Sequence, residues 1–180
     1  MRPFDGLPRC YAMRILPLLP LLLVAGCVGV PPHADLAAPQ PVFVPAAFFT
    51  GRTEGHARLK VIFGSTRPVH VVGEGRVMRD GTLVLDQVVT QAGKPPKRRE
   101  WRIRETAPGH YSGTLTDASG AVVGEVTGNC LHLTYPMKGG VKAEQWIYLQ
   151  PGGATALNRM SITKFGIPVA RLAETITKAG

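Results

Sequence analysis

The chain is poor in cysteine, and it contains none of the short motifs that mark a hydrolase or a zinc centre. There is no G-x-S-x-G, no H-E-x-x-H and no paired C-x-x-C, and the five histidines are scattered along the sequence. Such motifs hold a nucleophile or metal ligands at a fixed spacing, so without them no catalytic or metal site is legible. We therefore expect no metal and no dissociable cofactor.

The chain also lacks an apolar run long enough to span a membrane. The longest candidate is residues 15–24, whereas a transmembrane helix needs roughly 20 apolar residues. Pro17 and Pro20 would also disturb a helix in this run. A short apolar run behind a basic residue, here Arg14, is instead typical of a secretory signal.

Small residues follow this run and end at a cysteine. Val24, Ala25 and Gly26 precede Cys27, which is the layout of a bacterial lipobox. The small side chains fit the peptidase cleft, and the thiol can take a diacylglyceryl group, whereas a plain secretory signal leaves no cysteine at the cut. The pattern predicts a membrane anchor on Cys27, made of a covalent diacylglycerol and an N-acyl chain.

These features predict four segments. Residues 1–12 are a mis-assigned start, because Met13 is the natural first residue of the signal peptide at 13–26. Residues 27–47 hold the lipidated cysteine and a flexible tether rich in proline and alanine, and 48–180 are the folded domain. Val28 stands where an aspartate would favour retention in the inner membrane. We therefore expect the outer membrane of a Gram-negative bacterium, with the domain facing the periplasm.

Acidic residues are few. The chain has 21 Lys and Arg against 12 Asp and Glu, and without the leader 18 basic and 11 acidic residues remain. In an envelope the available polyanions are anionic lipid head groups and lipopolysaccharide rather than nucleic acid. The positive charge therefore indicates contact with such lipids, although simple solubility explains it equally well.

One thiol remains once the leader is removed and Cys27 is lipidated. A single cysteine, Cys130, cannot form an internal disulfide, so the apolar core must hold the fold. We expect Cys130 to be a small buried residue. Cys130 and His132 would share one strand face, and a nucleophilic Cys–His pair is the alternative, but no third group that could orient the histidine is readable.

From residue 48 onward the sequence reads as short strands separated by turn signals such as Asp80-Gly81. The final segment fits either a strand or a helix, and we favour a strand. The expected strands are 57–63, 69–78, 82–90, 99–105, 111–116, 121–126, 131–135, 141–149, 156–164 and 167–178.

About nine or ten such strands predict an all-β, antiparallel, lipocalin-like or calycin-like barrel. Closing the sheet removes its exposed edges, which suits a monomer. Interiors of this size are filled by side chains or hold one small ligand.

Two groups of residues are candidates for binding. Trp146, Tyr148, Asn158 and Arg159 could line the lumen and contact a ligand, and core packing or an ion pair of Arg159 with Glu144 is the alternative. Lys97, Arg98, Arg99, Arg102 and Arg104, beginning near Lys94, could contact anionic lipid or lipopolysaccharide. Their alternative is a solvated edge that blocks strand addition.

Several segments resemble an uncharacterised family of small proteobacterial lipoproteins, over nearly the whole mature chain. They are FFTGRTEG at 48–55, YSG at 111–113, GN at 128–129, WIYLQP at 146–151, NR at 158–159 and TKFG at 163–166. The resemblance implies a lipobox signal and a lipocalin-like barrel, but no activity or ligand. The family tends to carry an acid directly before this tryptophan, where this chain has Gln145.

The sequence thus favours a membrane-anchored envelope lipoprotein whose barrel binds a small amphipathic or lipid-like molecule without catalysis. One alternative is an accessory protein with a filled barrel and a protein partner. Another is a barrel enzyme acting on an apolar substrate. The volume of the lumen discriminates between them.

Overall fold

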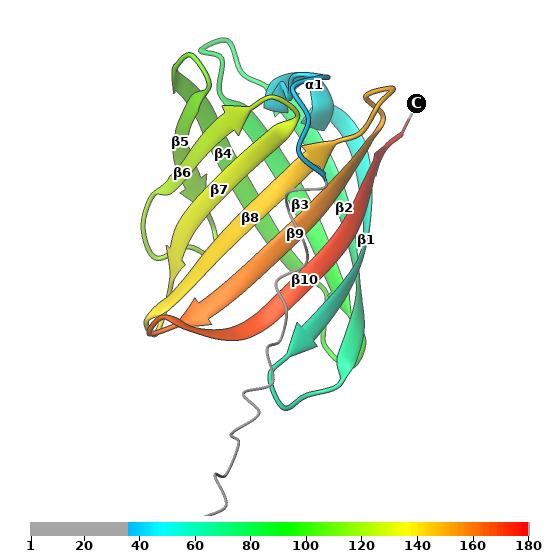
Figure 1. Ribbon diagram of the computed structural model, residues 1–180, viewed down its shortest axis with the longest axis vertical. Helices are drawn as coiled ribbons and strands as arrows, with labels where there is room; N and C mark the ends of the chain where they lie inside the picture. Colours follow the sequence, from blue (N-terminus) through cyan, green and yellow to red (C-terminus); the bar gives the residue numbers. More distant parts are fainter. Residues whose placement is uncertain (1–35, 180) are drawn as a thin grey trace, which may run out of the picture.

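The computed structural model describes residues 36–179 and consists of one closed antiparallel barrel with a single short helix (Figure 1). The prediction of an all-β barrel is therefore confirmed. The helix is α1 (Pro45–Phe49). The ten strands are β1 (Gly51–Val61), β2 (Thr66–Val77), β3 (Leu83–Gln91), β4 (Lys97–Ala107), β5 (His110–Leu115), β6 (Val122–Thr127), β7 (Cys130–Met137), β8 (Val141–Leu149), β9 (Thr155–Lys164) and β10 (Ile167–Lys178).

The barrel is a simple meander in which each strand pairs with the next one along the chain. It closes where β1 pairs with β10, in a register that places Gly55 opposite Ile176 and Leu59 opposite Leu172. The segment of residues 36–179 contains the ten strands of the closed barrel, the short helix and an apolar core. Within it, no helix is long and apolar enough to cross a bilayer.

Side chains alternate between the lumen and the outer surface, as the two-residue period of a strand requires. On β3, Leu83 and Leu85 are buried in the lumen, and on β4 Trp101 and Ile103 meet them. On β8 the inward set includes Ile147 and Leu149. Burying these apolar side chains is the main favourable term in folding, at roughly 25 cal/mol per Å².

One end of the barrel is closed by the segment that precedes β1. Phe43, Phe48 and Phe49 are buried and pack against one another, with ring centroids 4.9–6.2 Å apart. Pro45 begins the short helix, where its missing N–H costs nothing. Figure 1 shows α1 over this end of the barrel.

The expected flexible tether is therefore wrong for residues 36–47. Asn129, which is 3 % exposed, holds them through side-chain bonds: its Oδ1 accepts from the Ala38 amide at 2.7 Å and its Nδ2 donates to the Leu36 carbonyl at 3.0 Å. Phe43, which would be exposed in a tether, is buried instead. The predicted signal peptide and Cys27 lie outside the described residues.

The opposite end of the barrel is open. On β1, β3, β9 and β10 the inward-facing Leu59, Val89, Ile162 and Leu172 are only half-buried, whereas Leu115, Tyr135 and Ala143 on the other side of this end are buried. A side chain that points into the lumen can be reached by solvent only through the lumen, so the interior opens at this end. The five turns here are residues 62–65, 92–96, 116–121, 138–140 and 165–166.

Two of these turns contain a phenylalanine in a left-handed backbone conformation. Phe63 has a φ of 57° and Phe165 a φ of 49°. A residue with a bulky side chain adopts this region only at a cost of roughly 1–3 kcal/mol. Glycine or asparagine is the usual solution at such a position.

We expect Asn129→Ala to lower the free energy of unfolding by about 2–4 kcal/mol, because several buried backbone groups lose their partner. Besides Ala38 and Leu36, the Leu149 carbonyl accepts from Asn129 Nδ2 at 3.0 Å. Urea unfolding followed by tryptophan fluorescence measures the change. Ser112→Ala on the exposed face of β5 is the control, and equal stabilities of the two variants would contradict this account.

Candidate functional site

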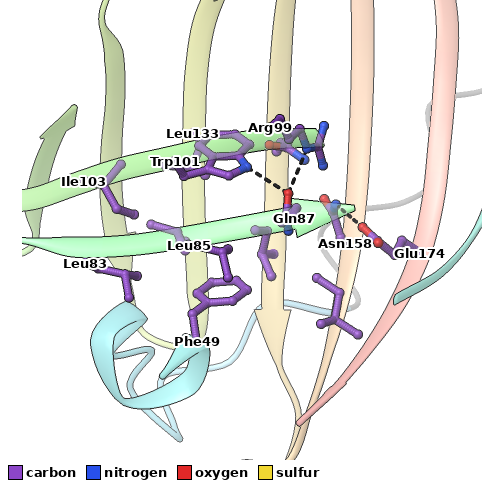
Figure 2. A pocket seen from close by; sticks show the side chains of 14 residues that line it. Phe49, Leu83, Leu85, Gln87, Arg99, Trp101, Ile103, Leu133, Asn158 and Glu174 are labelled. Carbon is purple, nitrogen blue, oxygen red and sulfur yellow. Dashed lines mark hydrogen bonds between the residues drawn. The ribbon is translucent and has the colours of Figure 1, made fainter. Parts of the chain in front are cut away.

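The candidate site is a pocket inside the lumen, between the α1 plug and the open end. It leaves about 40 Å³ for a water-sized molecule, which is room for about three waters. Figure 2 shows apolar side chains such as Phe49 and Leu85 at the α1 side and polar side chains from two walls beside them. The polar set consists of Gln87, Arg99, Gln145, Asn158 and Glu174.

The first polar wall comes from β3 and β4, where Gln87 and Arg99 are direct cross-strand partners. Gln87 Oε1 accepts from Arg99 Nε at 2.8 Å and from Trp101 Nε1 at 2.9 Å (Figure 2). The guanidinium of Arg99 also lies 5.7 Å from the centroid of the Trp101 ring. Arg99 makes no ion pair with any described residue. Arg99 lines the pocket and thus contributes a cation to its wall.

The second polar wall comes from β9 and β10, where Asn158 and Glu174 are cross-strand partners. Asn158 is 2 % exposed and Glu174 is 8 % exposed. Asn158 Nδ2 donates to Glu174 Oε2 at 2.8 Å (Figure 2), while Asn158 Oδ1 is buried without a hydrogen-bond partner. Such an orphaned acceptor costs about 1–3 kcal/mol. Gly55 on β1 makes room for the carboxyl group, since a Cβ there would collide with it.

Burial raises the pKa of Glu174, because the ionised carboxylate loses its hydration. The hydrogen bond from Asn158 and the positive charge of Arg99 oppose this shift without cancelling it. The pocket therefore combines a permanent cation, an unpaired amide oxygen and a carboxyl group that resists ionisation. It can accept a polar group that offers both an acceptor and a donor.

Among the predicted lumen residues, only Asn158 lines the pocket. The prediction that Trp146, Tyr148 and Arg159 face the lumen is wrong, because the alternating residues Gln145, Ile147 and Asn158 point inward. Trp146 instead stacks on His132 outside the barrel, with ring centroids 4.9 Å apart. Both faces of β8 carry large apolar side chains, so its pattern did not identify the inner one.

The predicted basic surface is divided by the structure. Arg99 faces the pocket, so its assignment to a surface contact is wrong. Lys97 pairs with Asp117 at 2.7 Å, and Arg102 lies 3.8 Å from Glu100. Of this group, Arg98, Arg102 and Arg104 are exposed on the outer face of β4. Asp117 and Glu100 thus neutralise part of the positive charge of the predicted basic surface.

Cys130 and His132 lie on the outer face and do not form an activated pair. Burial raises the pKa of the Cys130 thiol, which favours the unreactive protonated form. Burial also raises the pKa of the neighbouring Tyr148 to about 12. The thiol is half-buried beside a tyrosine, as expected for a packed side chain.

Three side chains on the outer face of β1 and β2 could approach a metal ion. The ligand atoms of Glu54, His56 and His70 lie within 4.8 Å of one another. Glu54 Oε1 is 2.6 Å from His70 Nε2 and 3.6 Å from His56 Nε2, and this bond to His70 lowers the pKa of Glu54. The two imidazole rings are stacked, and Arg52 also acts on the carboxylate. These contacts explain the arrangement of Glu54, His56 and His70 as a hydrogen-bonded cluster, without a metal ion.

The sequence did not predict Gln87 and Glu174 as site residues, nor the pocket position of Arg99, and it marked Gln145 only as the residue before Trp146. A signal was present in the polar residues that interrupt the inward apolar positions of their strands, such as Gln87 after Leu83 and Leu85. Their convergence depends on the register of four different strands. No local pattern reports that register.

Fold and pocket together define a lipocalin-like antiparallel barrel, a class that can bind a small ligand in its interior. This chain belongs to the DUF3833 family, a family of unknown function, whose sequence profile matches residues 21–178. The resemblance to an uncharacterised family is thereby confirmed. A comparison with curated proteins finds no match.

Two solved structures have a similar fold. The S-type phycobiliprotein lyase CPES from Guillardia theta has a TM-score of 0.59 at 8 % identity, over 73 % of this chain and 88 % of that one. A protein of unknown function from the DUF3598 family of Nostoc punctiforme has a TM-score of 0.59 at 10 % identity, over 81 % of this chain and 53 % of that one. At such identities the likeness concerns the fold alone.

We expect Glu174→Gln to stabilise the protein at neutral pH but not in acid. Because the pKa of Glu174 is raised in the folded state, folding opposes its ionisation. This penalty is absent when both states are protonated. It develops as the pH rises above the unfolded pKa of about 4.3 and is complete above the folded pKa. Glutamine never ionises and keeps a hydrogen-bond acceptor for Asn158.

Urea midpoints at pH 3.5 and pH 8 measure this effect. The midpoint of the variant should exceed that of the wild type at pH 8 and match it at pH 3.5. Glu125→Gln, at an exposed position of β6, should change neither value. A Glu174→Gln effect of the same size at both pH values would rule out ionisation as the cause.

Proposed function

We propose that this protein is a lipid-anchored envelope lipoprotein whose barrel binds a small amphipathic molecule without chemical conversion. The polar end of the ligand would occupy the pocket of Arg99, Asn158 and Glu174. Its apolar part would extend toward the open end. The protein would act as a monomer in the outer membrane, with the barrel in the periplasm and no nucleic-acid partner.

The observation that carries this proposal is the unpaired Asn158 Oδ1 beside Arg99. A buried acceptor without a partner is costly, and so is a cation that is partly withdrawn from water without an ion pair. A ligand that donates to Asn158 and accepts from Arg99 would satisfy both groups at once. The protonated form of Glu174 could contribute a further donor, since burial raises its pKa.

The size of the lumen restricts how such a ligand would bind. About 40 Å³ accommodates only a small polar group, whereas drug-sized ligands occupy roughly 300–1,000 Å³. The half-buried side chains toward the open end are apolar, including Leu59, Val89, Met160 and Leu172. A single acyl chain could lie among them, with the flexible side chain of Met160 adapting to it.

The membrane anchor is supported by the lipobox layout before Cys27. A lipidated cysteine would hold the domain at a membrane surface, where amphipathic molecules are concentrated. Several acyl chains on one cysteine anchor stably, whereas a single chain does so only marginally. The anchor and the lumen thus fit one role in the envelope.

A second candidate function is an accessory module with a filled barrel and a protein partner. The small pocket favours it, because most of the lumen is occupied by buried apolar side chains and by the phenylalanines of the plug. In that case the polar walls would serve specificity of folding. Measured occupancy of the lumen distinguishes the two candidates.

We expect the barrel to bind one ligand molecule per chain. Residues 36–180 would be exported to the periplasm, incubated with extracted envelope lipids and analysed by native mass spectrometry. Arg99→Met should lower the bound fraction at least tenfold, because it keeps the aliphatic packing but removes the cation.

Arg102→Met is the matched control, since Arg102 lies on the same strand and is exposed on the outer face. It should bind as the wild type does. A ligand-free wild-type mass after incubation would refute the binding function and favour the filled barrel. Equal binding by both variants would place the ligand outside the pocket.

Cys27→Ser in the full chain should abolish the lipid anchor. The wild type should incorporate labelled palmitate and enter the detergent phase of Triton X-114, whereas the variant should do neither. Cys130→Ser is the control because Cys130 lies in a barrel strand, and it should label normally. Labelling that persists in Cys27→Ser would overturn the assignment of the anchor.

A further inference from the structure

We propose that the open end of the barrel docks on the surface of an anionic phospholipid bilayer, with Phe63 and Phe165 entering the head-group region. The proposal deepens the proposed envelope function and rests on that location. Neither its observations nor its test requires a ligand in the lumen.

Two phenylalanines project into water at this end. Phe63 is 101 % exposed and Phe165 is 79 % exposed, and both lie in turns opposite α1 (Figure 1). Each is followed by a glycine, so both turns read Phe-Gly. Each phenylalanine also has the left-handed conformation described above. Both turns therefore expose a large apolar ring at a position where glycine or asparagine would adopt the backbone conformation with less strain.

The two turns belong to neighbouring hairpins. Because β1 pairs with β10, the Ile62 amide donates to the Val169 carbonyl at 2.8 Å. A groove of about 450 Å³ lies along this junction, and its apolar lining includes Ile62, Phe63 and Ile167. Ile167 is itself 63 % exposed. Phe63 thus lies in an apolar groove with Ile62 and Ile167, and Phe165 precedes Ile167 by two residues in the next hairpin. We call these four exposed side chains the apolar rim.

Phe165 is held in place at the end of its hairpin. Its amide donates to the Gly140 carbonyl at 3.1 Å, and its ring covers Gly140, where a Cβ would collide with it. The ammonium group of Lys164 lies 5.8 Å from the centroid of the ring. The ring is therefore presented in a defined position, with a cation beside it.

The charge around the rim is positive. Four of the five turns at this end lie within residues 60–73, 87–99, 136–143 and 159–173, which contain no Asp or Glu, whereas the fifth turn, 116–121, contains Asp117. Lys97 and Lys142 are paired with Asp117 and Glu144, respectively. The other basic residues in or beside these turns are Lys60, Arg67, Lys94, Lys138, Lys164 and Arg171. A polybasic rim around exposed aromatic rings matches the phosphates and acyl boundary of an anionic bilayer.

This charge also argues against a second copy of the chain as the occupant. Two such rims would bring like charges together around the apolar contact. A bilayer instead supplies counter-charge and an apolar phase at the same surface. Docking in this orientation would bring the mouth of the lumen to the lipid, so that an amphipathic molecule could enter without crossing water.

The test measures binding of residues 36–180 to vesicles, so that the predicted anchor plays no part. Vesicles of phosphatidylethanolamine with phosphatidylglycerol should bind the protein, and vesicles of phosphatidylcholine alone should bind it at least tenfold more weakly. Binding should weaken as the salt concentration rises. The variant Phe63→Asn with Phe165→Asn should reduce the partition coefficient at least tenfold.

Asparagine tolerates the left-handed conformation, so this double variant should melt at the same temperature as the wild type or higher. A loss of lipid binding would then not reflect unfolding. Val123→Asn is the matched control, because Val123 is 58 % exposed on the outer face of β6, and it should bind as the wild type does.

Equal binding to both vesicle types, or undiminished binding by the double variant, would overturn the docking proposal. So would a wild-type dimer in sedimentation velocity that the double variant lacks, since the rim would then be an interface between copies. Ligand occupancy of the lumen is measured separately in solution. A barrel that binds its ligand but no vesicles would refute docking alone, and one that binds vesicles but no ligand would refute the lumen function alone.

Discussion

The pairing of β1 with β10 is the constraint on which the rest of the structure depends. Once the sheet closes, every second side chain of ten strands must share one lumen, and no strand edge remains to be protected. The pairing also sets Gly55 against Ile176 and brings Glu174 beside a glycine that leaves it space. It joins the two hairpins that form the apolar rim as well. The pocket and the rim therefore both depend on this closure.

The lumen divides into layers with different tasks. Near α1 the side chains are apolar and buried, and they supply the stability of the fold. In the middle, Arg99, Asn158 and Glu174 introduce polar groups, and one of their buried atoms, Asn158 Oδ1, has no hydrogen-bond partner. Such groups weaken a core, and a fold that keeps them does so against its own stability. The middle layer is thus the part of the interior that packing alone does not explain.

The sequence predicted the strands and their closure well, because alternation and turn residues such as Asp80-Gly81 act locally. It failed where the answer depended on distant partners. The composition of residues 36–47 is that of a tether, but Gly128 and Asn129, about 90 positions away, bind this segment to the barrel. The inner face of β8 was ambiguous because Trp146 and Ile147 are both large and apolar. The pairing of Gln87 with Arg99 required a register that no single strand encodes.

Residues 36–38 are attached to the closed end of the barrel. This attachment shortens the linker between the barrel and any lipid on Cys27. Eight residues lie between position 27 and position 36, and the nine steps of a fully extended chain between them reach about 30 Å. The longest strands have 12 residues, and with a tilt of about 40° they span about 30 Å along the barrel axis. A lipidated chain could therefore bring its open end to the bilayer only by running taut along one side of the barrel. The linker between Cys27 and residue 36 would then determine which side of the barrel faces the lipidated cysteine.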